Sequence, residues 1–280
     1  MRYNELTFTD NFMFCKVISN NPDICRRILE MILGQKIKSV EIKSAEHVID
    51  LTIEAKSIRM DVYLDDDRGT VYDLEMQTTR EKNLPKRLRY YQGIMDLNSI
   101  EKGMDYDQLP EMVIVFICIF DYFNASIPFY VFENRCEADP SVKLGDGVKK
   151  VFVNPRGIKD GLDDDTRSFL DYINGIKTDN AFVGEIEAAV DKARRHKEWE
   201  IEYMNWRAYE MDVDIDKRKA REAGLAEGRA EGRAEGRAEG RAEGRTSLVI
   251  DMVRKGDMTL ESGARWLEVS EKEMKALLEN

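Results

Sequence analysis

Two neighbouring stretches of alternating polarity constrain the fold of this chain more than any other feature. In the first, Ile58, Met60, Val62 and Leu64 alternate with Arg59, Asp61 and Tyr63; in the second, Tyr72, Leu74 and Met76 alternate with Val71, Asp73, Glu75 and Gln77. A period of two places each set on its own face of a β-strand. The pattern therefore predicts two strands, each with one apolar face and one face on which acids recur.

The residues between these stretches predict a tight turn and thereby a register. A three-residue hairpin loop favours glycine at its last position, where the backbone is left-handed, and Asp67-Arg68-Gly69 fits that rule. With this turn Asp66 pairs with Thr70, and Asp61 comes to lie opposite Glu75. Directly opposed side chains of an antiparallel pair are about 4.5–5.5 Å apart at Cβ.

Two carboxylates at that separation repel each other, so each resists ionisation. A divalent cation between them would convert this repulsion into binding. The same pattern also fits an exposed hairpin face that carries scattered acids. A slip of one residue would move Glu75 to the other face, so the metal hypothesis depends on the predicted register.

Length and composition limit the classes of protein to consider. A chain of 280 residues suits one large domain or two small ones, and 42% hydrophobic residues support a real core. The net charge of −11 argues against a protein that coats nucleic acid generally, although it leaves room for a local basic groove. The two histidines, His47 and His196, are too few for a three-histidine zinc site.

The location is predicted from the N-terminus, the apolar runs and the cysteines. The first seven residues lack the apolar core of a signal peptide. The longest apolar run, 112–120, is far too short to span a bilayer. The four cysteines show no CxxC spacing, and Cys118 lies inside that apolar run, which favours buried, reduced thiols. We expect a cytoplasmic protein that does not enter a membrane.

The rest of the chain predicts alternating helices and strands. Residues 7–33 read as helical, with Thr9 or Asp10 at the start, an interruption at Asn21-Pro22-Asp23 and a stop at Gly34. The continuous apolar run 112–120 is typical of a strand buried on both faces. We further predict strands at 40–42, 50–55, 129–132 and 151–153, and helices at 84–97, 163–173 and 181–209. The stripe Trp199, Tyr203 and Trp206 is expected to be core.

A locally basic segment follows directly on the acidic hairpin. The sequence between Thr79 and Tyr91 contains one acidic residue, Glu81, and five basic residues: Arg80, Lys82, Lys86, Arg87 and Arg89. Such a segment is either a solvated charged face or a surface that contacts phosphates beside the metal, a role for which arginine is favoured by its forked geometry.

The C-terminal part changes character. Ala-Glu-Gly-Arg repeats five times from Ala226 to Arg245. On a helix, glycine at every fourth position costs about 1 kcal/mol relative to alanine, and like charges four residues apart repel. We predict a marginal helix or linker that self-associates through its glycine stripe. Residues 246–280 predict three short helices, with a stop at Gly256 and a capping box formed by Ser270 and Glu273. Their acidic balance disfavours DNA binding and favours an interaction module.

Several motifs together resemble the PD-(D/E)XK nuclease family transposases, also called the Rpn (recombination-promoting nuclease) family of bacteria. The resemblance covers most of residues 6–215. It rests on Leu6-Thr-Phe-Thr-Asp-Asn-Phe-Met-Phe, Arg59-Met-Asp-Val-Tyr, Tyr72-Asp-Leu-Glu-Met-Gln-Thr-Thr, Leu84-Pro-Lys-Arg-Leu-Arg-Tyr-Tyr-Gln and Phe132-Glu-Asn-Arg-Cys.

The resemblance implies an α/β, restriction-endonuclease-like fold: a mixed sheet flanked by helices, here followed by a helical C-terminal tail. It also implies metal-dependent cleavage of DNA. Asp61 and Glu75 match the family's acids and would hold Mg²⁺ or Mn²⁺. Gln77 matches the position that lysine holds in the wider superfamily, and Asp10 matches an acid often found in the first helix. Because Gln77 carries no charge, either catalysis is weaker or the site borrows a charge from Arg59, Arg80 or Lys82, among which Arg59 is the first candidate.

Two functions follow from these observations. The first is a Mg²⁺-dependent deoxyribonuclease acting in recombination, mobile-element biology or defence, with Asp61, Glu75 and Gln77 as catalytic residues. Its DNA contacts would come from Arg59, Arg80, Lys82, Lys86, Arg87 and Arg89. The second is a catalytically silent DNA-binding or assembly module on the same fold. The expected domains are a nuclease-like domain at 1–215, a repeat linker at 216–245 and a helical module at 246–280.

The glycine stripe gives a first prediction. A chain shortened to end near Asp216 loses the surface proposed for self-association, so its particle mass in solution falls to that of a monomer. Multi-angle light scattering of the full and shortened chains measures this difference. An unchanged number of subunits in the shortened chain would contradict the prediction.

Overall fold

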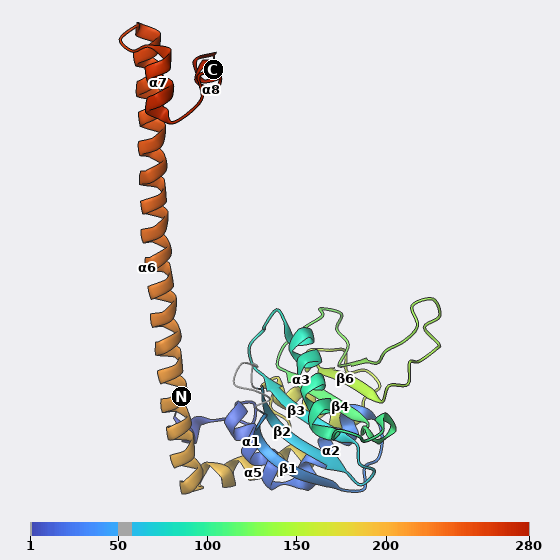
Figure 1. The fold of residues 1–280 in the computed structure, drawn as a ribbon. Helices are drawn as coiled ribbons and strands as arrows, with labels where there is room; N and C mark the ends of the chain where they lie inside the picture. The colour runs from blue at the N-terminus through green and yellow to red at the C-terminus, as the bar shows by residue number, and fades with distance from the viewer. Residues whose placement is uncertain (1, 50–57, 280) are drawn as a thin grey trace. The chain divides into compact units, whose positions relative to one another are not determined.

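The structure is a computed structural model that describes residues 2–49 and 58–279 (Figure 1). Six strands are present in this part: β1 (Val40–Ile49), β2 (Ile58–Asp66), β3 (Val71–Gln77), β4 (Met112–Cys118), β5 (Phe129–Phe132) and β6 (Val148–Val153). The helices are α1 (Asn11–Asn20), α2 (Pro22–Leu33), α3 (Leu84–Ser99), α4 (Asp164–Ile173), α5 (Ala181–Arg194), α6 (Lys197–Lys255), α7 (Leu260–Leu267) and α8 (Glu271–Glu279). Short 3₁₀ turns lie at Tyr3–Glu5 and Tyr106–Gln108.

The strands form one mixed sheet in the order β1-β2-β3-β4-β6-β5. Strands β1, β2 and β3 pair antiparallel, whereas β4 lies parallel to both β3 and β6. All seven residues of β4 are buried, as expected for a strand inside a sheet that is covered on both faces. The predicted mixed sheet flanked by helices is confirmed.

The hairpin has the predicted register. Val62 pairs with Leu74, and Leu64 pairs with Tyr72. The backbone N–H of Asp66 donates to the Thr70 carbonyl at 3.0 Å, which closes the loop that was predicted. Gly69 has a φ of 80°, the left-handed conformation that this turn requires.

Two predicted elements differ in extent. The strand predicted at 40–42 continues to Ile49, because β1 pairs with β2 beyond a register shift between Ile42 and Ser44. The extension was not predicted because it contains several polar residues, which are tolerated in a strand at the edge of a sheet. The stretch predicted to be helical over 181–209 is interrupted once: α5 ends at Arg194, and α6 begins at Lys197. The strand predicted at 50–55 lies outside the described residues.

Helix α3 lies over strands β3 and β4 (Figure 1). Its buried residues Leu88, Tyr91 and Met95 belong to the same hydrophobic cluster as Ile114 and Phe116 of β4. Helices α1 and α2 contact β1, and α1 also contacts β2 and β3. The hairpin of β2 and β3 therefore lies near two helices: α1, which precedes it in the chain, and α3, which follows it.

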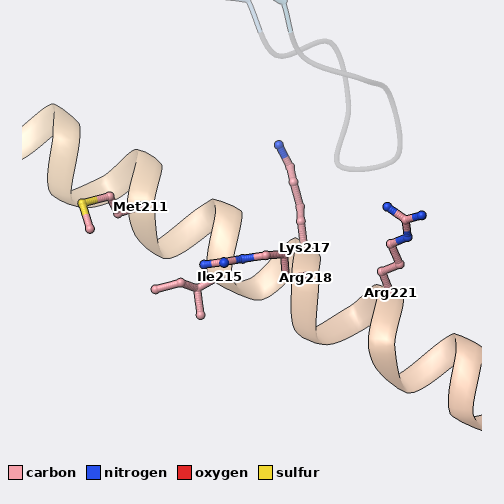
Figure 2. A pocket seen from close by; sticks show the side chains of 5 residues that line it. All are labelled: Met211, Ile215, Lys217, Arg218 and Arg221. Atoms are coloured by element: carbon pink, nitrogen blue, oxygen red, sulfur yellow. The ribbon is translucent and has the colours of Figure 1, made fainter. Parts of the chain in front are cut away.

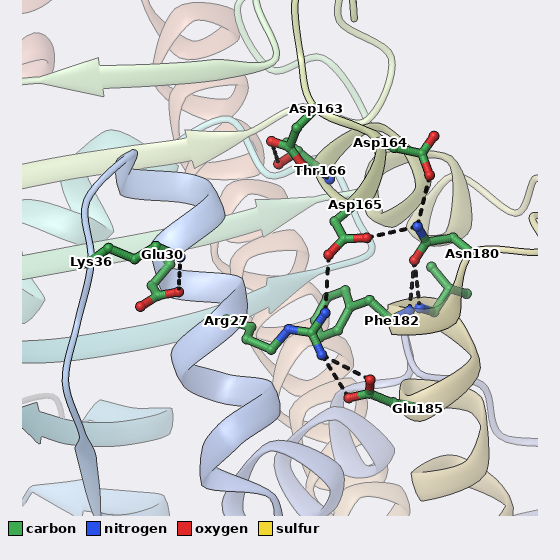
Figure 3. A network of polar contacts seen from close by, with 11 residues as sticks. Arg27, Glu30, Lys36, Asp163, Asp164, Asp165, Thr166, Asn180, Phe182 and Glu185 are labelled. Atoms are coloured by element: carbon green, nitrogen blue, oxygen red, sulfur yellow. Dashed lines mark hydrogen bonds and ion pairs between the residues drawn. The ribbon is translucent and has the colours of Figure 1, made fainter.

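A polar network ties α2 to the helices that come later in the chain (Figure 3). The Arg27 guanidinium of α2 donates to Asp165 of α4 at 3.1 Å and to Glu185 of α5 at 2.8 and 3.0 Å. The Asn180 amide oxygen caps α5, and its Nδ2 donates to Asp165 at 2.9 Å. These contacts hold the N-terminal helix pair in place beside the sheet.

The chain divides into two compact units, 1–205 and 206–280, with the boundary inside α6. The three-part division at 215 and 245 stays a prediction. Tyr203 is buried against the rings of Tyr3 and Phe12, so this member of the predicted stripe is core. Within the described ranges 2–49 and 58–279, we find no helix with the length and apolar character needed to cross a bilayer.

The second unit consists of the later part of α6 followed by α7 and α8. The repeat is helical, and α6 ends at Lys255, directly before Gly256, which has a φ of 82°. Val249, Ala264 and Met274 form the buried core of the three helices. A Cβ at Gly263 would lie only 2.8 Å from Cγ2 of Val253, so this position favours glycine. The predicted capping box is confirmed: Ser270 N donates to Glu273 at 2.8 Å, and Glu273 N donates to Ser270 Oγ at 3.2 Å.

The hairpin turn generates a second prediction, at Asp66. Burial opposes ionisation of this carboxyl, but donation by the Tyr72 hydroxyl and by the backbone N–H groups of Arg68 and Thr70 lowers its pKa. A lowered folded pKa stabilises the fold above the unfolded pKa of about 4, and this contribution is lost as pH falls through the folded value. Asp66→Asn should lower the free energy of unfolding by about 1–3 kcal/mol at pH 7.

Urea unfolding monitored by circular dichroism measures this loss. The gap between variant and wild type should narrow below pH 4. Asp160→Asn, at an exposed position, is the matched control and should have little effect. A loss of the same size at pH 3 and pH 7 would contradict a stabilising role for the ionised carboxylate.

Candidate functional site

The strands of the hairpin separate at the two predicted acids. The β2–β3 pairing ends at Val62 and Leu74, one step before Asp61 and Glu75 would face each other. From there side chains replace the backbone ladder: Asp61 N donates to Glu75 Oε1 at 3.1 Å, and Met76 N donates to Asp61 Oδ2 at 2.9 Å. Each carboxylate is thus held by the backbone of the other's strand, and both meet at one junction.

Helix α1 supports Asp61 through Asn11. The Asn11 amide Nδ2 lies 2.8 Å from both carboxylate oxygens of Asp61. Its predecessor Asp10 occupies the N-cap position of α1, but its carboxylate accepts hydrogen bonds from Thr7 N at 2.6 Å and Thr7 Oγ1 at 2.9 Å. The residue of this helix that reaches the acids is therefore Asn11, and Asp10 organises the turn before the helix.

Helix α3 supports Glu75 through Arg87. The Arg87 guanidinium forms an ion pair with Glu75 Oε2, and its Nη1 donates to Gln77 Oε1 at 3.3 Å. The rings of Tyr91 and Phe116 each lie 5.2 Å from the guanidinium carbon. Arg87 is the positive charge beside the glutamine, although the sequence indicated Arg59, Arg80 or Lys82 for that role.

A third acid, Asp73, lies on the same face of β3, two residues before Glu75. It is fully buried, and neither of its carboxylate oxygens has a hydrogen-bond partner. Its register partner in β2 is Tyr63. Burying an unpaired carboxylate is costly, and a buried acid of this kind gains a cation or a proton where one can reach it.

Burial controls the ionisation of this cluster. It raises the pKa of the Asp73 and Glu75 carboxyls well above their ordinary values, and the nearby charge of Asp61 raises both further. The Arg87 guanidinium acts in the opposite direction on both groups. Three buried carboxyls thus lie near one guanidinium, and ionisation of one carboxyl makes ionisation of the others harder.

The donor set suits a divalent cation in its chemistry. Asp61, Asp73 and Glu75 offer only oxygen ligands, which Mg²⁺ and Mn²⁺ prefer, and the two buried oxygens of Asp73 have no hydrogen-bond partner within the described part of the chain. In the part of the chain that the structure describes, no three acid, histidine or cysteine side chains are gathered as a bound ion would gather them. Glu75 is turned to Arg87 instead.

The remaining basic residues have different surroundings. Lys82, Lys86 and Arg89 are exposed. Arg80 is exposed as well, but its Nη2 donates to the Tyr122 carbonyl at 3.0 Å. Arg59 lies in β2, and its side chain is outside the described part of the structure. Among the members of this basic set whose side chains the structure describes, Arg87 is the one that pairs with an acid of the junction.

A separate hollow lies on α6 in the second unit (Figure 2). It is lined by Met211, Ile215, Lys217, Arg218 and Arg221. These lining side chains are apolar or basic, and none of the five is an oxygen ligand for a cation. The acidic junction of the hairpin remains the candidate site.

Comparison with known proteins identifies the family of this chain. Residues 8–223 match the family described as PD-(D/E)XK nuclease family transposase. The chain belongs to this family. No curated protein and no solved structure matches it. Membership suggests a nuclease that acts on DNA, and PD-(D/E)XK nucleases generally use divalent metals.

Sequence reasoning did not select two residues of this candidate site, Asp73 and Asn11. The period of two already placed Asp73 with Glu75 and Gln77, but nothing in the sequence showed that it would be buried without a partner. No local signal pointed to Asn11, because its contact with Asp61 joins residues 50 positions apart in the chain. Only the packing of α1 against β2 creates that contact.

Asp73 generates a third prediction. A folded pKa above the unfolded one means that the carboxyl destabilises the fold most at pH values above the folded pKa, and that this cost shrinks as pH falls below the folded pKa and is gone below the unfolded pKa of about 4. Asp73→Asn in EDTA should therefore raise the free energy of unfolding at pH 8 by about 1–3 kcal/mol. At lower pH the wild type becomes protonated and should approach the variant.

Thermal and urea unfolding at several pH values measure this gain. The exposed Asp107→Asn is the matched control, for which no comparable gain is expected. A variant less stable than wild type at pH 8 would show that the Asp73 carboxylate stabilises the fold, which is the opposite of the expected effect.

Proposed function

We propose that this protein is a metal-dependent DNA endonuclease that hydrolyses phosphodiester bonds, in a recombination, mobile-element or defence setting. One observation supports this proposal above the others. Asp61 and Glu75 meet at one junction, each held by the backbone of the other's strand, in a chain that belongs to a nuclease family.

The residues of the site divide the work of hydrolysis. Asp61 and Glu75 would hold Mg²⁺ or Mn²⁺. When bound, such an ion lowers the pKa of water and offsets the charge that grows on the phosphate. Gln77 shares the face of Glu75 and orients the attacking water through its side-chain amide. The water loses a proton to solvent and its oxygen bonds to phosphorus as the ester P–O bond breaks, and the leaving oxygen takes up a proton from solvent.

DNA would approach along the basic segment that follows the hairpin. Lys82, Lys86 and Arg89 are exposed, so their charges are open to phosphates. Arg80 and Arg59 are assigned to the same surface. Contacts of this kind position the duplex without reading its sequence.

The repeat of α6 is proposed to mediate self-association. Each of the five glycines of the repeat has open space where a side chain would point. Helices approach most closely where such small residues line the contact. The chain shortened to end near Asp216 tests this assignment.

A catalytically silent module is the second candidate. Two observations favour it: Gln77 carries no charge, and Glu75 is already neutralised by Arg87. Isothermal calorimetry separates the two functions. Retained DNA binding without heat from Mg²⁺ or Mn²⁺ would favour the silent module, whereas heat from either ion favours the nuclease.

The proposed nuclease generates a fourth prediction. Asp61→Asn keeps the shape of the side chain but removes its charge. In a plasmid-nicking assay with Mg²⁺ or Mn²⁺, it should lower the rate by at least about 100-fold. It should also reduce the rise in melting temperature that Mn²⁺ causes, because ligand binding to the folded state is the source of that rise.

Asp65→Asn is the matched control, since Asp65 lies on the same strand and pairs with Lys43 away from the junction. Its nicking rate should equal that of wild type. Equal rates for wild type and Asp61→Asn would remove the proposed site.

A further inference from the structure

Arg87 differs from the other basic residues of its segment because its side chain contacts the acidic junction, and neither the proposed DNA-contacting surface nor the proposed metal ligands explain this contact. Its side chain is about one quarter exposed, while that of the Glu75 it pairs with is 1% exposed. Its guanidinium also donates to Gln77, which stands at the position that matches a lysine in the wider superfamily. Lys86 and Arg89, its neighbours on the same helix, remain exposed. Arg87 is thus an internal cation of the acidic junction.

An arginine in this place affects a metal ion directly. Its guanidinium repels a divalent cation, and it competes for the Glu75 oxygen that the ion would need. Glu75 must therefore leave Arg87 before it can serve as a ligand. The rings of Tyr91 and Phe116 would still hold the guanidinium at the site, because arginine packs well against aromatic faces.

We propose that Arg87 has two successive partners, an assignment that rests on the proposed nuclease function. In the free protein it pairs with Glu75 and competes with a divalent cation for that carboxylate. When a divalent cation binds the Glu75 carboxylate, the guanidinium is released from Glu75 and binds a phosphate of DNA through its planar fork. Arg87 then supplies the positive charge that Gln77 cannot supply.

Arg87→Met tests both halves of this assignment, and the expected effects have opposite signs. Without DNA, the variant should bind Mn²⁺ about tenfold more tightly in calorimetry, because a competing positive charge is gone. With DNA, its nicking rate should fall by at least about 100-fold, because the phosphate loses its partner. Arg195→Met, at an exposed position, is the matched control and should change neither quantity.

A charge transfer tests the second half separately. Gln77→Lys combined with Arg87→Met places a cation at position 77 and should restore much of the nicking that Arg87→Met loses. A residue that serves only to hold the fold would not be replaced in this way. Nicking by the double variant that stays at the level of Arg87→Met would overturn the proposed phosphate role.

Other outcomes are equally decisive. If Arg87→Met melts too early to assay, Arg87→Lys is used; it keeps one charge without the fork, and should retain the Mn²⁺ affinity of wild type with a lower nicking rate. Unchanged Mn²⁺ affinity in a folded Arg87→Met overturns the competition. A wild type that neither binds Mn²⁺ nor cuts DNA overturns the proposed function itself, whereas a wild type that does both leaves that function intact.

Discussion

The separation of two strands at a pair of acids is the interaction on which the site depends. Beyond Val62 and Leu74 the ladder stops, and the Asp61 and Glu75 carboxylates accept the backbone N–H groups that would otherwise lack partners. Buried backbone donors need acceptors, so this exchange keeps the open end of the hairpin satisfied. It also fixes two acids at one junction, which is a strong positional constraint for side chains inside a protein.

The cost of that arrangement is electrostatic. Three carboxyls are buried close together, and the Arg87 guanidinium pairs with one of them. Like charges held together at low exposure resist ionisation, which is the usual condition of a site adapted to bind a cation or move a proton. The helices complete the site from two directions, because Asn11 comes from α1 and Arg87 from α3.

The second unit follows a different logic. The repeat in α6 is helical although its glycines oppose helix formation, and its side chains are largely exposed. Stability there comes from the C-terminal end, where Val249, Ala264 and Met274 are buried together. Helical order in an isolated charged repeat is generally weak without such packing.

The sequence by itself determined the hairpin. Period-two alternation and the glycine at position 69 were enough to set its strands, turn and register, because these depend on local backbone geometry. The buried strand β4 and the caps at Gly34 and Ser270 were determined in the same local way. Tertiary structure alone decided that Asp73 is buried without a partner, that Asn11 holds Asp61, and that Arg87 turns inward. These outcomes depend on how distant elements pack, and residue spacing along the chain carries no record of that packing.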